Sequence, residues 1–238
     1  MMDVTGERHY GVLSGDDMAK WRATYDEPLT YDYGDYTAMK TGPWGQGPAQ
    51  LQTLALLRDY NISAMDPVGP DFVHIVVEAT KLAFADREAF YGDPNFVEVP
   101  MKTLLSDEYN AARRDLIDMG EASMGFQPGS IDGFGGVVDY EAHVAAGQMT
   151  LGAGIGEPTF SKQGVVAGDT CHVDVIDRHG NMVACMPSGG WLQSSPVIPE
   201  IGFCLNSRAQ MFWLEAGRPG SLEPGKRPRT TLSPSMTL

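Results

Sequence analysis

An α+β fold is predicted by the order in which structural patterns follow one another along the 238 residues. Apolar residues recur at helical spacing in the first half of the chain. A glycine-rich stretch at residues 120–168 holds twelve of the 28 glycines. Short alternating segments typical of strands come after it. Apart from one short strand predicted at 35–41, the strands therefore follow the helices, which is typical of an α+β fold.

The acidic balance of the chain argues against one broad class of partner. It holds 17 basic and 31 acidic residues, for a net charge of −14. Such a chain is repelled by nucleic-acid phosphates and by anionic membrane surfaces, so we expect neither as a partner. No window reaches the run of about 18 apolar residues that a membrane helix needs, and the first residues lack the pattern of a signal peptide. The compartment, cytoplasmic or periplasmic, stays open.

The cysteines, Cys171, Cys185 and Cys204, form neither a disulfide framework nor a metal-binding pattern. We expect Cys171 and Cys185 to lie near each other across a hairpin as free, buried thiols. The sequence also lacks paired carboxylates, zinc-ligand spacing and a phosphate-binding loop. It therefore predicts no metal and no organic cofactor.

The first part of the chain predicts one short strand and a helix. Residues 1–35 are polar and show little apolar periodicity, whereas residues 35–41 alternate enough for a strand. The following segment, GPWGQGP at 42–48, is a turn that leads into a helix, with Pro48 in its first turn. One face of that helix carries Leu51, Leu54, Ala55 and Arg58.

Two further helices are predicted before the glycine-rich segment. The clearer one begins after Asp71 as its cap and carries an apolar stripe from Phe72 to Phe90. Gly92–Pro94 ends it, and we expect three charged residues to lie off its stripe: Glu78, Lys81 and Arg87. The next helix is predicted over Ser106–Met119, capped by Ser106, with an inner face of Leu105, Tyr109, Ala112, Leu116 and Met119.

A β-hairpin is predicted directly after the glycine-rich segment. Its strands are CHVDVI at 171–176 and NMVACMP at 181–187, and Gly180 is free to take a positive φ in the turn. A third short strand is expected at 201–206. The hairpin therefore opens at the dipeptide Asp169–Thr170, immediately after a long stretch with no periodic element.

That dipeptide suggests a specific chemistry. A threonine hydroxyl within a chain is a weak nucleophile because nothing takes its proton. If the bond after Asp169 is cut, the new α-amino group of Thr170 has a pKa of about 7.7 to 8.0 and can act as a base near neutral pH. One residue then supplies nucleophile and base together. The alternative interpretation is a threonine that merely opens a strand.

Three other positions are candidate ligand contacts, each with a simpler interpretation. Thr230 and Thr231 follow GKRPR and can donate to a carboxylate, or they belong to a solvated turn. Ser188 precedes two glycines and can face a ligand, or it belongs to a glycine turn. Arg208 can bind a carboxylate with its planar guanidinium, or it is a surface charge.

Taken together, the motifs resemble the γ-glutamyltransferase family of N-terminal-nucleophile amidases. Four segments match in order: GPWGQGPAQLQTLALL (42–57), EATKLAFADREAFYGDPNF (78–96), DTCHVDVIDRHGNMVA (169–184) and PGKRPRTTLSPS (224–235). The resemblance covers residues from about 15 to the end. It implies a four-layer αββα sandwich and a γ-glutamyl or related amide as substrate, with no cofactor.

The resemblance also implies a role for each candidate residue. Thr170 would be the nucleophile, released by self-cleavage after Asp169, and Ser188 would stand where the family has a threonine that assists it. Thr230 and Thr231 would stand where the family has serines that bind the donor's α-carboxylate. Residues 1–169 would be part of the large subunit and 170–238 part of the small subunit, which stay together, as one folding domain.

Some positions depart from the family's pattern. The family's asparagine two positions after the assisting hydroxyl is Gly190 here, and the residues that hold the donor's α-amino group fall at Arg208 and Met211. Arg208 would repel an ammonium by like charge. We therefore expect an acyl donor with a carboxylate but no ammonium, such as a glutaryl-like or oxo-acid amide, as an alternative to a γ-glutamyl donor.

Two rival functions stay open at this point. The first is a non-catalytic, unprocessed relative that keeps the fold. The second is a thiol enzyme that uses Cys171, although His172 next to it on a strand points to the other face. The resemblance further places the oxyanion-hole glycines beyond Leu238 and a carboxylate-binding arginine before Met1. We therefore expect a piece of a longer protein, truncated at both ends and inactive alone.

Overall fold

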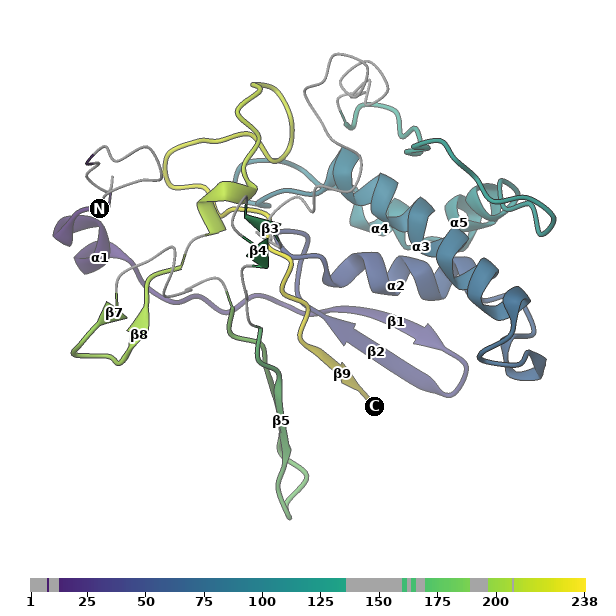
Figure 1. Ribbon diagram of the computed structural model, residues 1–238, viewed down its shortest axis with the longest axis horizontal. Helices are drawn as coiled ribbons and strands as arrows, with labels where there is room; N and C mark the ends of the chain where they lie inside the picture. The colour runs from purple at the N-terminus through teal and green to yellow at the C-terminus, as the bar shows by residue number, and fades with distance from the viewer. Residues whose placement is uncertain are drawn as a thin grey trace.

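The computed structural model describes residues 8, 13–135, 160–161, 164–165, 170–188, 197–206 and 208–238, and it shows a mixed helix and sheet fold, as predicted. A three-stranded antiparallel sheet of β1 (Leu29–Tyr33), β2 (Tyr36–Lys40) and β9 (Ser235–Thr237) forms one layer. Helices α2 (Gly47–Leu57), α3 (Pro70–Phe90) and α5 (Asp107–Arg114) gather above it (Figure 1). The other elements are α1 (Gly15–Lys20), η1 (Ile62–Ala64), α4 (Met101–Leu104), β3 (Phe160–Ser161), β4 (Gly164–Val165), β5 (Val173–Ile176), β6 (Met182–Cys185), β7 (Val197–Ile198), β8 (Phe203–Cys204) and η2 (Arg208–Met211).

The sheet joins segments that are far apart in the chain. The strand predicted at 35–41 is β2, and its partner β1 lies in the part that showed little periodicity. The sequence LTYDY gives only a weak signal for this strand, because only Tyr31 is buried. On its other side, β2 pairs with β9, so that Lys40 lies opposite Ser235. This pairing brings the end of the chain beside the first half.

The main core lies between α2 and α3. Both helices carry proline in their first turn, as predicted for Pro48. Gly69, not Asp71, is the N-cap of α3; Asp71 instead lies within the first turn, where its charge favours the positive end of the helix dipole. The buried apolar residues of this core are Ala49, Leu56, Leu57, Ile75, Ala79, Leu82, Ala83, Ala89, Phe90, Tyr91 and Leu104.

Charged residues of α3 are buried where the apolar stripe predicted exposure. Glu78 and Arg87 are only 3% and 4% exposed. Each has a partner that makes burial possible: Glu78 accepts from Lys81 and from the backbone N–H of Ser123, and Arg87 pairs with Glu88. The expectation that these two side chains lie off the buried face is therefore wrong, because later segments of the chain cover α3 on more than one side.

The helix predicted over Ser106–Met119 is shorter than expected. Ser106 caps α5 by accepting from Tyr109 N, as predicted, but the helix ends at Arg114. The next amides, those of Leu116 and Ile117, bond three residues back rather than four, which tightens the chain into a turn. The predicted inner face of this helix is therefore wrong, since Ala112, Leu116 and Met119 are exposed.

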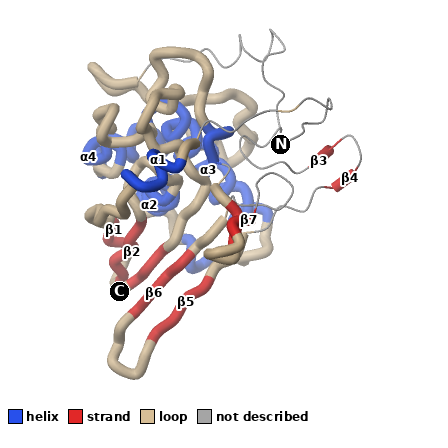
Figure 2. Tube along the Cα trace, turned by 90° about the vertical axis from the view of Figure 1, so that its left-hand side faces the viewer, coloured by secondary structure: helices blue, strands red, loops and turns tan. Residues whose placement is uncertain are grey.

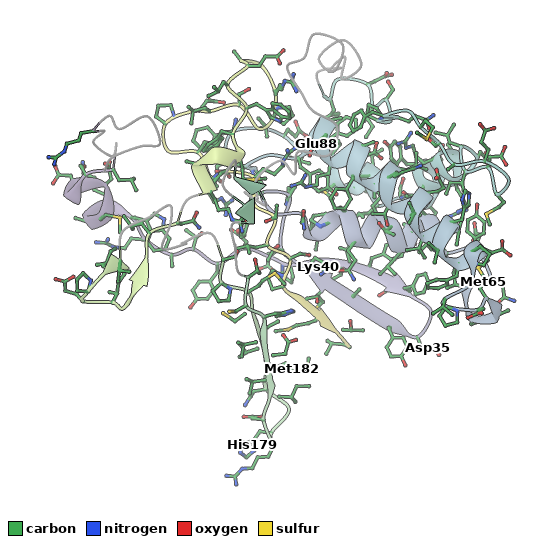
Figure 3. All side chains as sticks on the ribbon, viewed as in Figure 1. Asp35, Lys40, Met65, Glu88, His179 and Met182 are labelled. Carbon is green, nitrogen blue, oxygen red and sulfur yellow. The ribbon has the colours of Figure 1, made fainter. Side chains whose placement is uncertain are left out.

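The predicted hairpin forms as β5 and β6, with Gly180 in its turn at a φ of 84°. It extends away from the helices, as the positions of Met182 and His179 show, while its base contacts β9 (Figures 2 and 3). Cys171 and Cys185 are free but exposed, because this two-stranded hairpin has no described layer packed on it, so the buried-thiol expectation is wrong. The strand expected at 201–206 is β8, which pairs with β7; the side chain of Cys204 lies outside the described part.

Candidate active site

The register of the β5–β6 hairpin brings two of the predicted site residues together. The pairing of Val173 with Cys185 continues outward to an isolated antiparallel bridge between Thr170 and Ser188. Cys171 N donates to Pro187 O at 3.2 Å, which holds this end of the hairpin closed. The two hydroxyl oxygens, Thr170 Oγ1 and Ser188 Oγ, are 2.7 Å apart, which is hydrogen-bond distance.

Arg208 joins this pair from a separate element. It begins the short helix η2, and its backbone N–H donates to Asn206 Oδ1 at 2.6 Å. Its side chain donates from Nη2 to Ser188 Oγ at 2.8 Å. Arg208 is only 1% exposed, so it is not the surface charge of the simpler interpretation. Thr170, Ser188 and Arg208 therefore form one continuous polar chain.

The loop that carries Thr230 and Thr231 is held firmly beside the sheet. Thr230 is 5% exposed; its N–H donates to Trp44 O at 2.8 Å and its Oγ1 accepts from Leu232 N at 3.2 Å. Three residues further on, Ser233 N lies 3.3 Å from Met186 Sδ. Met186 precedes Ser188 by two residues, so the loop reaches the hairpin close to the base that holds the Thr170–Ser188 contact.

Arg227 anchors the start of this loop to two carboxylates. Its guanidinium pairs with Asp93 and Asp26 at 3.1 and 2.8 Å, and it lies over the Trp44 ring at 5.0 Å. Asp93 also accepts from the Arg227 backbone N–H at 2.8 Å. Burial alone would raise the pKa of Asp93, but these hydrogen bonds from Arg227 and Asn95 outweigh it and hold the pKa below its usual value.

A second anchor is a buried cluster that the sequence interpretation missed. Arg229, which directly precedes Thr230, pairs with Glu88 at 2.7 Å, and Arg87 pairs with the same carboxylate at 2.6 Å. Burial and the nearby Arg229 lower the pKa of Arg87 to about 10. Figure 3 places Glu88 on α3. No local pattern in the sequence signals this contact, because Arg229 and Glu88 are 141 positions apart.

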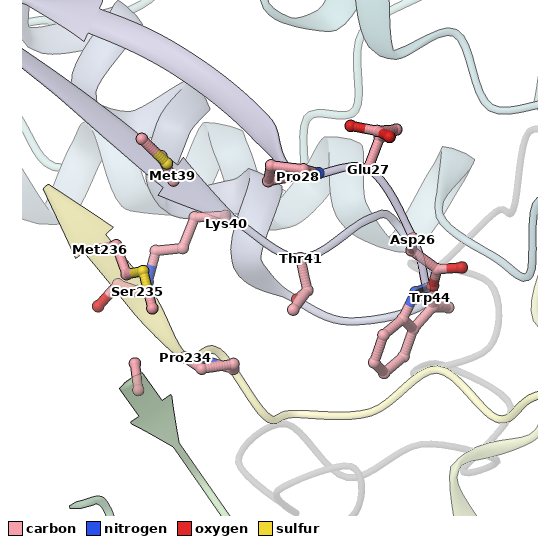
Figure 4. A pocket seen from close by; sticks show the side chains of 11 residues that line it. Asp26, Glu27, Pro28, Met39, Lys40, Thr41, Trp44, Pro234, Ser235 and Met236 are labelled. Atoms are coloured by element: carbon pink, nitrogen blue, oxygen red, sulfur yellow. Dashed lines mark hydrogen bonds between the residues drawn. The ribbon is translucent and has the colours of Figure 1, made fainter. Parts of the chain in front are cut away.

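Lys40 lies beside an apolar cavity of about 240 Å³ next to β2 and β9 (Figure 4). Its ammonium donates to the carbonyl and hydroxyl oxygens of Ser233 at 3.1 and 3.0 Å, so it also holds the threonine loop. Burial lowers the pKa of Lys40. The side chains around the cavity come from Asp26, Glu27, Pro28, Met39, Lys40, Thr41, Trp44, Ala184, Pro234, Ser235 and Met236.

The remaining candidates give a mixed result. Asp169 and Gly190 lie outside the described residues. His172 pairs with Asp174 at 2.9 Å, on the same side of the strand, which leaves the thiol of Cys171 without support from that imidazole.

In the part of the chain that the structure describes, no three His, Cys, Asp or Glu side chains form a group that could hold a metal ion. None of its helices is both long and apolar enough to cross a membrane.

Residues 2–238 match the family described as Gamma-glutamyltranspeptidase. The chain belongs to the gamma-glutamyltranspeptidase family. This assignment confirms the family resemblance and agrees with an α+β fold of the N-terminal-nucleophile hydrolase type. It rests on nearly the whole chain, including the hairpin and the threonine loop described above.

Members of the gamma-glutamyltranspeptidase family and related solved structures are similar to this chain along its length. The solved structure of LmbA2991T421A is 51% identical, with a TM-score of 0.82, and the match covers 100% of this chain and 38% of that one. "Acylase ACY 1 proenzyme" of Pseudomonas sp. (strain SE83) is 30% identical, over 96% of this chain and 35% of its own length. "Glutathione hydrolase proenzyme" of Bacillus subtilis subsp. natto is 28% identical, over 95% and 36%. The chain therefore spans little more than a third of these relatives.

Proposed function

We propose that this chain is part of a self-processing amidase or acyltransferase in which Thr170 is the nucleophile. The observation that carries the proposal is the 2.7 Å contact between the hydroxyls of Thr170 and Ser188, at the open end of the β5–β6 hairpin. The chain that holds this contact belongs to the gamma-glutamyltranspeptidase family. Two relatives named above are proenzymes by name, which supports a processing step. Residues up to 169 would then belong to a large subunit and those from 170 to a small one.

Processing would proceed by attack of the threonine hydroxyl on the preceding carbonyl. Thr170 Oγ1 adds to the carbonyl carbon of Asp169, the bond from that carbon to Thr170 N breaks, and the proton of the hydroxyl ends on the released nitrogen. Water then hydrolyses the ester, which leaves a carboxyl group on Asp169 and a free α-amine on Thr170. This amine is the base that the mature nucleophile needs.

Turnover would use the same oxygen on an external amide. The α-amine takes the proton of Thr170 Oγ1 as the oxygen attacks the donor carbonyl, and it delivers a proton to the leaving amine. The acyl group is then held as an ester on Thr170 until water or another amine accepts it. No step needs a metal or an organic cofactor.

For the donor, we propose an acyl group that carries a carboxylate and no ammonium. Arg208 and Met211, at the positions expected to face the donor's α-amino group, are both 1% exposed. The guanidinium of Arg208 has no acceptor for an ammonium, and the thioether of Met211 is only a weak one. The positive charge of Arg208 favours a carboxylate and disfavours an ammonium. The hydroxyls of Thr230, whose Oγ1 accepts from Leu232 N, and of Thr231 would supply further carboxylate contacts. A γ-glutamyl donor, as the name glutathione hydrolase implies for that relative, is the second candidate.

The full-length protein tests this proposal with two anilides that differ by one group. Glutaryl anilide carries the carboxylate alone, and γ-glutamyl anilide carries an ammonium as well. We expect the glutaryl compound to have the higher kcat/KM, by about tenfold or more, and an acyl adduct to appear by mass on the chain that begins at Thr170. Thr170→Ala should give no adduct. Faster use of the γ-glutamyl compound would reject the donor assignment while leaving the nucleophile intact.

A further inference from the structure

We propose that Arg208 is a positioning residue for the nucleophile as well as a charge in the donor site. It orients Ser188 so that the Ser188 hydroxyl donates a hydrogen bond to Thr170 Oγ1. This inference rests on the proposed function, because it assigns a role within the same reaction. It arises from the unbroken contact from Arg208 Nη2 to Ser188 Oγ at 2.8 Å and from Ser188 Oγ to Thr170 Oγ1 at 2.7 Å.

In this polar chain the first hydrogen bond has a direction fixed by chemistry, and the second is assigned by the proposal. A guanidinium has donors only, so Ser188 Oγ must accept from Arg208. The hydroxyl of Ser188 keeps its own hydrogen, which can reach Thr170 Oγ1 at 2.7 Å, and the proposal assigns Ser188 as the donor of this second hydrogen bond. Thr170 Oγ1 then accepts, and its own proton is left to be transferred to nitrogen. The hydrogen bond from Ser188 is strongest while the proton of Thr170 Oγ1 is being removed, when negative charge on that oxygen is greatest.

Burial makes the effect of Arg208 stronger and its geometry more fixed. Its side chain is almost fully shielded from solvent, at 1% exposed, and hydrogen bonds between charged and neutral groups strengthen when water is excluded. The backbone N–H of Arg208 is held by Asn206 Oδ1 at 2.6 Å, which fixes the start of η2. Arg208 holds Ser188 in the donating orientation.

The positioning role of Arg208 predicts an effect on self-cleavage, whereas a role in donor binding alone predicts none. Self-cleavage after Asp169 uses the same Thr170 oxygen but needs no external substrate. If Arg208 acts through Ser188, its loss slows cleavage of the precursor itself. If Arg208 only binds the donor's carboxylate, its loss raises KM for that donor and leaves the rate of cleavage unchanged.

The experiment follows cleavage of freshly made full-length precursor with time, by intact mass, across a range of pH. The variants are Arg208→Met, Arg208→Lys, Ser188→Ala and the double variant Ser188→Ala with Arg208→Met. Arg218→Met is the matched control, because Arg218 is also a buried arginine, but it lies beyond η2 and pairs with Glu215. Circular dichroism and thermal melting verify that each precursor is folded.

We expect Arg208→Met and Ser188→Ala each to slow cleavage by about tenfold or more, and the double variant to be no slower than Ser188→Ala. Arg208→Lys, which keeps a charged donor, should stay within about threefold of wild type, and Arg218→Met should cleave normally. Cleavage of Arg208→Met at the wild-type rate, or single effects that multiply in the double variant, would overturn the inference. If Arg208→Met does not fold, normal cleavage by Ser188→Ala overturns it instead. A wild-type precursor that never cleaves rejects the proposed function itself.

Discussion

Glu88 illustrates how single residues control the candidate site. Its carboxylate lies between two guanidiniums, those of Arg87 and Arg229, and all three side chains are at most 10% exposed. Removing the carboxylate would leave two buried positive charges facing each other without compensation. Arg229 directly precedes Thr230, so the same loss would remove the contact between the threonine loop and α3.

We expect Glu88→Gln to lower the free energy of unfolding by about 3–5 kcal/mol, the usual cost of breaking a buried ion pair. Denaturant titration of the full-length protein measures it. The control is Arg58→Met, which removes an ion pair with Asp107 whose side chains are 50% and 70% exposed; it should cost at most about 1 kcal/mol. Equal effects of the two substitutions would contradict the account.

Asp93 gives a prediction about pH. Because its folded-state pKa is lowered by hydrogen bonds that outweigh burial, its contribution to stability is present above the unfolded pKa, near 3.8, and is lost as pH falls through the lower folded value. Asp93→Asn should lower the free energy of unfolding at pH 7 by about 1–3 kcal/mol. Its stability should also change less than wild type below pH 4. If the free energy of unfolding of the variant falls below pH 4 as steeply as that of wild type, Asp93 is not the group responsible for this loss of stability.

The sequence predicted some residues of the candidate site but not the buried charges that hold its loop. Thr170, Ser188 and Arg208 were named from local patterns and the family resemblance, and the structure brings them into contact. The cluster of Arg229, Glu88 and Arg87 was missed, since residues separated by more than 140 positions meet there and nothing local records that contact. Charged side chains on a helix are ordinarily exposed, which is why a buried Arg87 was not expected.

At the scale of elements, α2 and α3 form the most predictable part of the molecule. Their apolar spacing and the first-turn proline of α2 were predicted from the sequence, and their packing forms the main core. The end of α5 was less predictable, because the residues after Arg114 keep some apolar spacing although the backbone has already turned. Strand β1 was missed, since only one of its five residues is buried.

The core between these helices predicts a clear contrast between two truncations. Leu56→Ala, at a position that is 0% exposed, should lower the free energy of unfolding by about 2–5 kcal/mol. Val77→Ala, on the face of α3 where the side chain is 48% exposed, should change it by at most about 0.5 kcal/mol. Thermal and denaturant unfolding of the two full-length variants measure both values. Similar losses would mean that the outer face of α3 is covered in the full-length protein.

At the scale of the whole molecule, the pairing of β9 with β2 explains how distant segments form one site. It places the threonine loop between the sheet and the hairpin, where Lys40 and Met186 hold it through Ser233. This pairing could not be predicted from periodicity, which reports which face of a segment is buried but not which segment lies next to it. The family resemblance supplied the overall arrangement that the local patterns could not.

The measurement that tests the central claim most directly is the intact mass of the full-length protein with threonine or alanine at position 170. We expect wild type to separate into two chains, the smaller beginning at Thr170 with a free α-amine, and Thr170→Ala to stay whole. Wild-type protein that stays whole after prolonged incubation would contradict self-processing at Asp169–Thr170 and favour a non-catalytic relative. Cleavage of both proteins at this bond would contradict the role of Thr170 as the nucleophile.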